Sequence, residues 1–428
     1  MEPQKTNQQS TFGPMIICCA LFFILGFITW ANGTLIPFLK IACNLETDLQ
    51  AFFVAFASYI AYFFLALPSS WILKKIGFKN GLIVSLVILG LGSLIFIPAA
   101  DSRSYGLFLT GIFVQGAAMA LLQTAVNPYL SIIGPIESAA QRISIAGLFN
   151  KGAGITVPII FGTLFLKDAH QVTEKLAATT DELVKNQILD DLLQRVHAPY
   201  IALAVIFVVF AIIIRFAHLP DVEIDKEESS ELDASDTHQK QSVFQFPHLF
   251  LGSLAIFFCV AVEVMAGDII GVYGRELKID SFFVTYATTF TLSCMLVGYV
   301  IGIIAIPKYV TQQMALRVCT IVGIIFTLIS VLTTGTTSFI FVALLGIANS
   351  LMWPAIFPLG IKGLGRFTKV GSAIMIMGIA GGAIWPLVYG YLKDHLHIDF
   401  QHAFLYAMVP AYLYILFFAV KGHKAGKA

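Results

Sequence analysis

The sequence predicts an all-α membrane protein with twelve transmembrane helices in two six-helix halves, and three observations lead to this prediction. The chain of 428 residues is 58% hydrophobic and only 12% charged, about half the charged fraction of an average soluble protein. Its apolar residues come in runs of about 20 or more, the length that a helix needs to cross a bilayer. A repeat of Gly and Pro divides these runs into two sets. This composition excludes a disordered chain and an ordinary soluble enzyme, and the net charge of +1 does not indicate a nucleic-acid partner.

Twelve apolar runs can be placed along the chain. Backbone groups in lipid must form their hydrogen bonds internally, so runs of this length must be helices. An even number of spans puts both termini on the same side of the membrane. The runs lie at residues 14–38, 50–73, 80–99, 105–133, 143–166, 198–218, 246–273, 282–306, 314–333, 337–361, 368–392 and 402–421.

The distribution of Lys and Arg predicts which side of the membrane holds the termini. With the N-terminus inside, sixteen Lys and Arg residues lie on the inner side and nine on the outer side. Four of those nine fall in one long loop, residues 167–197, and long loops count little in the positive-inside rule. We therefore expect both termini in the cytoplasm.

Two polar stretches interrupt the apolar pattern. Residues 219–244 carry eight acids and two lysines, which is typical of a solvated cytoplasmic linker between an N-terminal bundle, 1–218, and a C-terminal bundle, 245–428. The stretch 167–197 has Leu and Val at helical spacing. An amphipathic helical cap on the outer surface and a solvated loop are both consistent with this pattern.

The fourth and fifth spans of the two halves share a spacing of Gly and Pro. Parallel six-helix repeats are one architecture of secondary transporters, in which the substrate site lies at the midplane between the repeats. Close helix packing alone would also favour small residues at these positions. The matched sets are Gly116 and Pro128 with Gly346 and Pro358, and Gly154, Pro158 and Gly162 with Gly382, Pro386 and Gly390.

Four segments carry a more specific signal: GFITWANGTLIP at 26–37, LQTAVNPY at 122–129, Phe149-Asn150 in the fifth span, and Val262-Glu263-Val264 in the seventh. They resemble the fucose–galactose–glucose:cation symporter family of the major facilitator superfamily, in particular its glucose/galactose branch. The resemblance covers essentially the whole chain. It implies a major facilitator fold and cation-coupled uptake of a hexose or hexose derivative across a bacterial inner membrane by alternating access.

The chain departs from the fucose-type members of this family at two positions. Those members carry Asp where this chain has Gly33 and Glu where it has Gln123, and both carboxylates are associated with proton coupling. The glucose/galactose branch has Gln at the second position and an acid at the position of Glu263. The carboxylate has thus moved from one half to the other, so the fucose–proton mechanism does not transfer directly.

Three charged residues fall inside apolar spans, where a charge costs at least about 2.5 kcal/mol. Glu263 lies near the middle of its span and Asp268 lies nearer the outer face. We expect Glu263 to be a coupling or sugar-binding carboxylate and a candidate sodium ligand, with a structural ion pair as the alternative. Asp268 is a second coupling candidate or a residue that caps or pairs near a gate.

Lys151 lies near the middle of the fifth span, and three roles are open for it. It could neutralise Glu263 or Asp268 across the interface between the halves. It could donate to a sugar hydroxyl or an acidic substrate. It could also replace an external cation by cycling its own proton.

Neutral polar and aromatic residues within the spans supply candidates for substrate binding. Amide side chains offer both donors and acceptors, which matches the hydroxyls of a sugar, and a Trp face suits the C–H face of a pyranose. Amides also hold helices together in membranes, and Trp30 and Trp385 are further aromatic candidates. The candidate substrate-binding residues are Asn32, Gln123, Asn127, Asn150, Asn349 and Trp353.

We therefore expect a monomeric cation-coupled sugar importer in the lipid bilayer, with sodium or a proton as the coupling ion and no cofactor. An uncoupled sugar facilitator is the first alternative, since both fucose-type carboxylates are missing. A sugar-sensing transceptor or a multidrug exporter on the same fold is the second. The sequence has no Walker A motif, zinc-spaced Cys or His pattern, or Ser nucleophile elbow, so we do not expect an enzyme.

Overall fold

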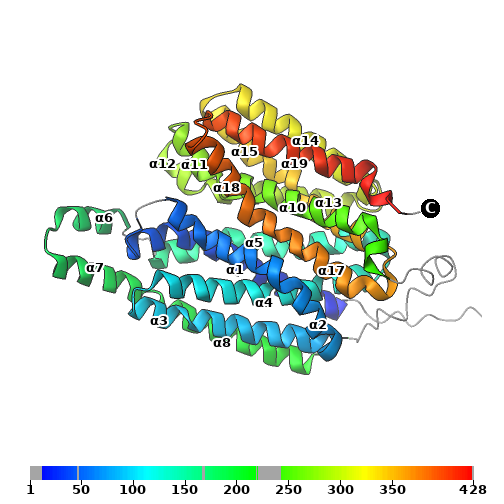
Figure 1. The fold of residues 1–428 in the computed structure, drawn as a ribbon, viewed down its shortest axis with the longest axis horizontal. Coiled ribbons are helices and arrows are strands. Elements are labelled where there is room, and N and C mark those ends of the chain that lie inside the picture. The colour runs from blue at the N-terminus through cyan, green and yellow to red at the C-terminus, as the bar shows by residue number, and fades with distance from the viewer. Residues whose placement is uncertain (1–11, 46–47, 166–168, 218, 220–241, 427–428) are drawn as a thin grey trace, which may run out of the picture.

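The computed structural model consists of helices packed into two bundles (Figure 1). It describes residues 12–217, 219 and 242–426, apart from 46–47 and 166–168. No strand occurs among these residues. The predicted all-α fold is therefore confirmed, whereas the predicted linker 219–244 lies almost wholly outside the described residues.

The N-terminal bundle contains six spans, and two of them belong to one helix, α2. This helix has 47 residues but is interrupted at Gly77, which has a φ of 78°. Gly81 lies against Leu73, although eight residues along a straight helix would separate them by about 12 Å. The chain therefore turns back at Gly77, and α2 is an antiparallel pair of spans. The bundle is formed by α1 (Phe12–Ala42), α2 (Asp48–Leu94), α3 (Phe96–Asp101), α4 (Tyr105–Ile132), α5 (Ala139–Phe165) and α8 (His197–Phe216).

The C-terminal bundle contains the other six spans, four of which are built from more than one helical segment. With α2 counted once, eleven helical stretches of the described chain are long and apolar enough to cross a membrane. The twelve predicted spans are thus accounted for. The segments are α10 (Pro247–Gly267) with α11 (Ile270–Glu276), α12 (Ser281–Thr285) with α13 (Ala287–Ala305), α14 (Gln312–Leu332), α15 (Gly335–Ser350) with α16 (Met352–Ile361), α17 (Thr368–Met377) with α18 (Gly381–Asp394), and α19 (Phe400–Val420).

Two short helices, α6 (Ala169–Ala178) and α7 (Glu182–Gln194), project beyond one end of the bundles (Figure 1). Arg103 holds α7 to the loop before α4. Its Nε donates to Asp190 at 2.6 Å, and its guanidinium also donates to the carbonyl oxygen of Asn186 at 2.7 Å. We call this end of the molecule the hairpin side. The opposite end, where α1 begins and α19 ends, is the termini side.

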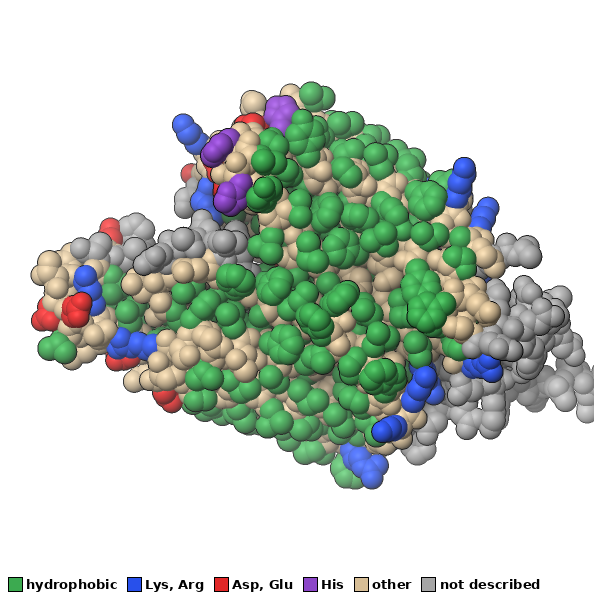
Figure 2. Space-filling model, in the orientation of Figure 1, with side chains coloured by type: hydrophobic (Ala, Val, Ile, Leu, Met, Phe, Trp, Pro, Cys, Tyr) green, Lys and Arg blue, Asp and Glu red, His purple; other side chains and the backbone are tan. Residues whose placement is uncertain are grey.

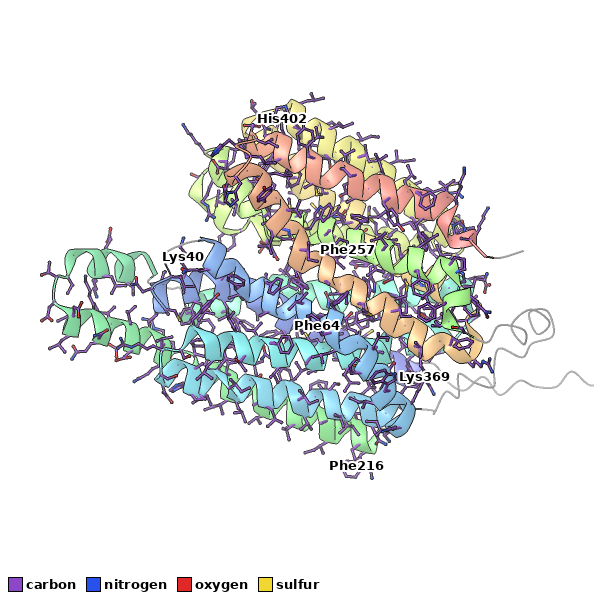
Figure 3. The ribbon with its side chains drawn as sticks, viewed as in Figure 1. Lys40, Phe64, Phe216, Phe257, Lys369 and His402 are labelled. Atoms are coloured by element: carbon purple, nitrogen blue, oxygen red, sulfur yellow. The ribbon has the colours of Figure 1, made fainter. Side chains whose placement is uncertain are left out.

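The surface has the composition expected of a protein that crosses a bilayer. Figure 2 shows a broad hydrophobic band between the two ends, with Lys and Arg at both ends and the visible Asp and Glu at the hairpin side. Large apolar side chains in this band are exposed, among them Phe64 on α2 and Phe216 on α8. Figure 3 places Lys369 at the termini side, and Lys40 and His402 at the hairpin side.

The glycines of the sequence repeat make matching contacts in the two bundles. A Cβ at Gly116 on α4 would collide with the backbone oxygen of Ser58 on α2, and a Cβ at Gly346 on α15 would collide with that of Thr291 on α13. In each bundle, therefore, the fourth span approaches the second span closely through a glycine.

A second matched pair of glycines lies where the bundles meet. Gly154 on α5 packs against Leu292 of the C-terminal bundle, and Gly382 on α18 packs against Tyr59 of the N-terminal bundle. The fifth span of each half thus contacts the second span of the other half. The two contacts are therefore related by the same repeat as the glycines themselves.

Candidate functional site

A cavity lies between the two bundles, at the depth of the charged residues within the spans. Its empty space of about 710 Å³ includes space that is open to the outside of the protein. Both bundles contribute to its walls, so relative movement of the bundles would reshape it. The lining residues are Phe22, Leu25, Thr29, Tyr59, Tyr62, Gln123, Ile143, Gly147, Asn150, Lys151, Val260, Glu263, Val264, Tyr299, Trp353 and Ile379.

An ion pair between Lys151 on α5 and Glu263 on α10 joins the bundles in this cavity. Lys151 Nζ donates to Glu263 Oε1, and the two side chains are only 7% and 16% exposed. Lys151 Nζ also lies 5.0 Å from the ring centroid of Trp30 on α1. Because a single charge is costly in an apolar span, each charge here compensates the other. Of the two predicted acidic partners, Lys151 thus pairs with Glu263.

Asp268 lies apart from this pair, at the C-terminal cap of α10, where its backbone N–H donates to Val264. It is within electrostatic reach of both Glu263 and Lys151, although it does not line the cavity. The short interruption between α10 and α11 occurs at this residue. Asp268 therefore places a second carboxyl group on the hairpin side of the ion pair.

Two predicted amides line the cavity and keep hydrogen-bonding capacity. Gln123 Nε2 donates to the hydroxyl of Tyr62 at 3.0 Å, so the amide oxygen and the phenolic hydrogen can still serve a ligand. Asn150 Nδ2 donates to the carbonyl oxygen of Phe22 on α1 at 3.2 Å. Trp353 adds an aromatic face and stacks on Phe357 with ring centroids 6.0 Å apart.

The structure does not bring Asn127 and Asn349, two other predicted amides, to this cavity. Asn349 is buried within the C-terminal bundle, where it donates to Val262 and accepts from the hydroxyl of Tyr412. Asn127 is buried on α4 and donates to the carbonyl oxygen of Gln123. The side chain of Asn32 lies outside the described residues. Trp385 donates to the carbonyl oxygen of Ala407 and is also absent from the cavity lining.

Three tyrosines that the sequence analysis missed line the cavity: Tyr59, Tyr62 and Tyr299. Tyr59 and Tyr62 are three residues apart on α2 and so share one helix face. Aromatic residues usually gather at the ends of a span. A tyrosine in the middle of a span could therefore have indicated a cavity-lining residue. Tyr299 packs across the interface on Gly147 of α5.

Hydrogen bonds connect the two bundles on the termini side of the cavity. Gln312 spans the interface: its Oε1 accepts from the backbone N–H of Ala140 at 3.2 Å and its Nε2 donates to the carbonyl oxygen of Ile136 at 3.0 Å. Gln141 donates to the carbonyl oxygen of Ile303 at 2.7 Å. These contacts hold the two bundles together on the termini side of the cavity.

The residues around Glu263 do not form a group of metal-ligating side chains. Within the described part of the chain, no cluster of three or more His, Cys, Asp or Glu residues could hold a metal ion. Glu263 offers a carboxylate, but one of its oxygens is engaged by the ammonium of Lys151. A sodium ion at Glu263 would therefore either share the carboxylate with that ammonium or displace it.

Comparison with known proteins agrees with this architecture. Residues 18–386 match the model of the Major Facilitator Superfamily. The chain is 35% identical over 425 residues to the glucose/galactose transporter of Brucella abortus biovar 1 (strain 9-941), covering 98% of this chain and 97% of that protein. It is 29% identical over 386 residues to the L-fucose-proton symporter of Escherichia coli (strain K12), covering 89% and 87% of the two chains.

Among solved structures, the fold is similar to a crystal structure of the transporter FucP in the outward conformation. The TM-score is 0.80 and the sequence identity 27%, and the match covers 95% of this chain and 97% of that one. Relatives of this kind are membrane transporters and not enzymes. The chain therefore belongs to the Major Facilitator Superfamily, in the group that contains the glucose/galactose transporters and the L-fucose-proton symporters.

Proposed function

We propose that this protein imports a hexose or hexose derivative together with a cation, by alternating access. The observation that carries the proposal is the Lys151–Glu263 ion pair in a cavity between the bundles. Relatives over nearly the whole chain are named for glucose/galactose transport and for fucose–proton symport, which supports a sugar as the substrate. Alternating access follows from a site whose walls come from two bundles that can rock relative to each other.

The sugar would bind to the amide and aromatic side chains of the cavity. Gln123 with Tyr62 presents a hydroxyl donor and an amide acceptor, and Asn150 presents a second amide from α5. Trp353 would stack on the apolar face of the ring. A neutral sugar fits because Lys151 and Glu263 already balance each other's charge.

Coupling would occur at Glu263. A proton or a sodium ion that binds this carboxylate would replace the ammonium of Lys151 as its partner and loosen the link between α5 and α10. Asp268 lies within electrostatic reach and would attract the cation. One relative is named as an L-fucose-proton symporter, which favours a proton as the coupling ion. A sodium ion is the alternative, since a carboxylate is a suitable oxygen ligand for a hard metal cation.

An uncoupled facilitator is the second candidate, and one observation favours it. The charge of Glu263 is compensated by Lys151 within the protein, so the bundles could rock without a bound cation. Such a protein would equilibrate sugar across the membrane but would not concentrate it.

We further propose that the termini side faces the cytoplasm of a bacterial inner membrane, because the twelve spans leave sixteen Lys and Arg residues on that side and nine on the other. The hydrogen bonds of Gln312 and Gln141 would then hold the bundles together on the cytoplasmic side of the cavity. A cysteine placed at Thr179, at the end of α6, should react with an impermeant reagent added outside cells, and one placed at Lys424 should not. The opposite pattern would reverse the orientation.

Uptake into liposomes tests the proposed function. Purified protein is reconstituted, sodium and pH gradients are imposed separately, and accumulation of labelled glucose, galactose, fucose, mannose and N-acetylglucosamine is followed. We expect one gradient to drive accumulation of at least one of these sugars. Counterflow that depends on neither pH nor sodium, with no accumulation under either gradient, would identify the facilitator, and absence of transport of every sugar would contradict a sugar substrate.

A further inference from the structure

Trp30 occupies a defined place beside the ion pair. Its indole is 5% exposed, and the ammonium of Lys151 lies 5.0 Å from its ring centroid, within the range of a cation–π interaction. Lys151 thus touches two partners at once, a carboxylate from the C-terminal bundle and an aromatic face from the N-terminal bundle. Only the second partner belongs to the same bundle as the lysine.

Two glycines make room for this indole. A Cβ at Gly154 on α5 would collide with the Trp30 ring, and a Cβ at Gly267 on α10 would lie 3.1 Å from it. Gly154 and Gly267 each lie about one turn beyond the charged residues toward the hairpin side. The indole therefore covers the ion pair from the hairpin side and reaches across to α10.

We propose that Trp30 is a positioning residue that keeps the ammonium of Lys151 in place when Glu263 loses its charge or takes another cation. This inference rests on the proposed function, in which Glu263 exchanges the ammonium for a coupling ion. During that exchange Lys151 would otherwise be a lone charge in an apolar span, which is costly. The aromatic face supplies a partner that stays with Lys151 when the bundles separate.

Other groups near the ammonium could compete for this role, and the experiment has to separate them from Trp30. Asp268 carries a carboxyl group at the C-terminal cap of α10 and interacts electrostatically with Lys151. The hydroxyls of Tyr59 on α2 and Tyr299 on α13 also line the cavity. Asp268 and Tyr299 belong to the C-terminal bundle, which would move away from Lys151. Tyr59, like Trp30, belongs to the N-terminal bundle.

A thermal-unfolding cycle tests the proposal without relying on transport. Trp30→Leu is combined with Lys151→Met in the Glu263→Gln protein and in the wild-type protein. In the Glu263→Gln protein, we expect Trp30→Leu to lower the unfolding midpoint by about 2–4 °C more when residue 151 is Lys than when it is Met. In the wild-type protein, where Glu263 holds the ammonium, this difference should be smaller. Asp268→Asn in the Glu263→Gln protein should leave the difference unchanged.

A shape-conserving substitution covers the case in which the leucine variants do not fold. Fluorinated tryptophans placed at position 30 keep the indole shape and weaken the electrostatic attraction of the ring face. In the Glu263→Gln protein, the midpoint should fall stepwise with the number of fluorines when residue 151 is Lys, and should not fall when it is Met. Equal effects in the two cases would overturn the proposal.

The outcome is separable from that of the proposed function. If neither gradient drives accumulation of sugar by the wild-type protein, then cation coupling fails while the unfolding cycle still reports on Trp30 and Lys151. If coupling is found but the cycle shows no dependence on Lys151, then only the role of Trp30 is wrong.

Discussion

Lys151 and Glu263 pair across the interface between the two bundles, each within a helix long and apolar enough to cross a membrane. Both side chains are largely shielded from solvent. The pair therefore links α5 to α10 at the level of the cavity, and any movement that separates these helices must find another partner for each charge.

Removal of the lysine should leave a buried carboxylate without its partner. We expect Lys151→Met to lower the stability of the protein by about 3–5 kcal/mol, as is typical when one member of a buried pair is lost. The double variant Lys151→Met/Glu263→Gln should recover most of this loss, because neither charge remains. Thermal unfolding in detergent measures both effects, and a double variant no more stable than the single one would show that the pair is not a structural unit.

Substitution of the cavity amides should weaken sugar binding. We expect Gln123→Leu and Asn150→Leu each to cost about 1–3 kcal/mol of binding free energy, because a buried sugar hydroxyl loses its partner. Binding calorimetry with the transported sugar measures this cost. Asn127 is the third amide that the sequence predicted for the site, and the sugar affinity of Asn127→Leu is measured in the same way.

Asn349→Leu is the matched control for these variants. Asn349 uses its amide within the C-terminal bundle, with Val262 and Tyr412. The leucine variant should lower thermal stability and leave sugar affinity unchanged. Wild-type affinity in well-folded Gln123→Leu and Asn150→Leu proteins would remove these amides from the sugar site.

Gln312 should control how often the termini side opens. Gln312→Leu removes two hydrogen bonds that cross the interface, which should favour the open state by about 1–3 kcal/mol. Spin labels at Glu137 and Lys308 would report the open state as a larger population of molecules with a long distance between the two labels. Gln115→Leu is the control, since Gln115 donates to Ser93 within one bundle; an equal shift in both variants would exclude a specific latch.

The hairpin side should depend on Arg103. Its guanidinium lowers the pKa of Asp190 below the ordinary value of 3.8 by hydrogen bonding to the carboxylate. The pairing therefore contributes stability above pH 4 and loses it only as the pH falls further, through the lowered pKa. We expect Asp190→Asn to speed amide hydrogen exchange in α7 between pH 5 and 8. Asp191→Asn, one residue along, should not; equal exchange rates in the two variants would contradict this anchor.

The sequence was sufficient to predict the spans and the charged residues, because both depend on local signals. A run of apolar residues and a charge within it each have a meaning in lipid that does not depend on distant contacts. This is why α2 could be divided into two spans from hydropathy, and why Lys151 and Glu263 could be identified as functional candidates before their contact was known.

The roles of the neutral polar residues could not be separated in the same way. Asn150 and Asn349 have the same side chain and similar surroundings in the sequence, but one lines the cavity while the other bonds to Tyr412 inside a bundle. That difference depends on which face of each helix meets its neighbours. For the same reason the roles of Tyr62 and Gln312 could be assigned only from the structure, because their partners lie on spans far apart in the sequence.

The variant Glu263→Gln decides whether the carboxylate of Glu263 couples sugar movement to a cation. Sugar exchange and gradient-driven accumulation are measured in the same liposomes, with Glu276→Gln, an acid that pairs with Lys393 on the hairpin side, as the control. We predict that Glu263→Gln keeps exchange but abolishes accumulation, whereas Glu276→Gln keeps both. If Glu263→Gln still concentrates sugar against a gradient, Glu263 is structural and coupling must occur elsewhere, at Asp268 or Lys151.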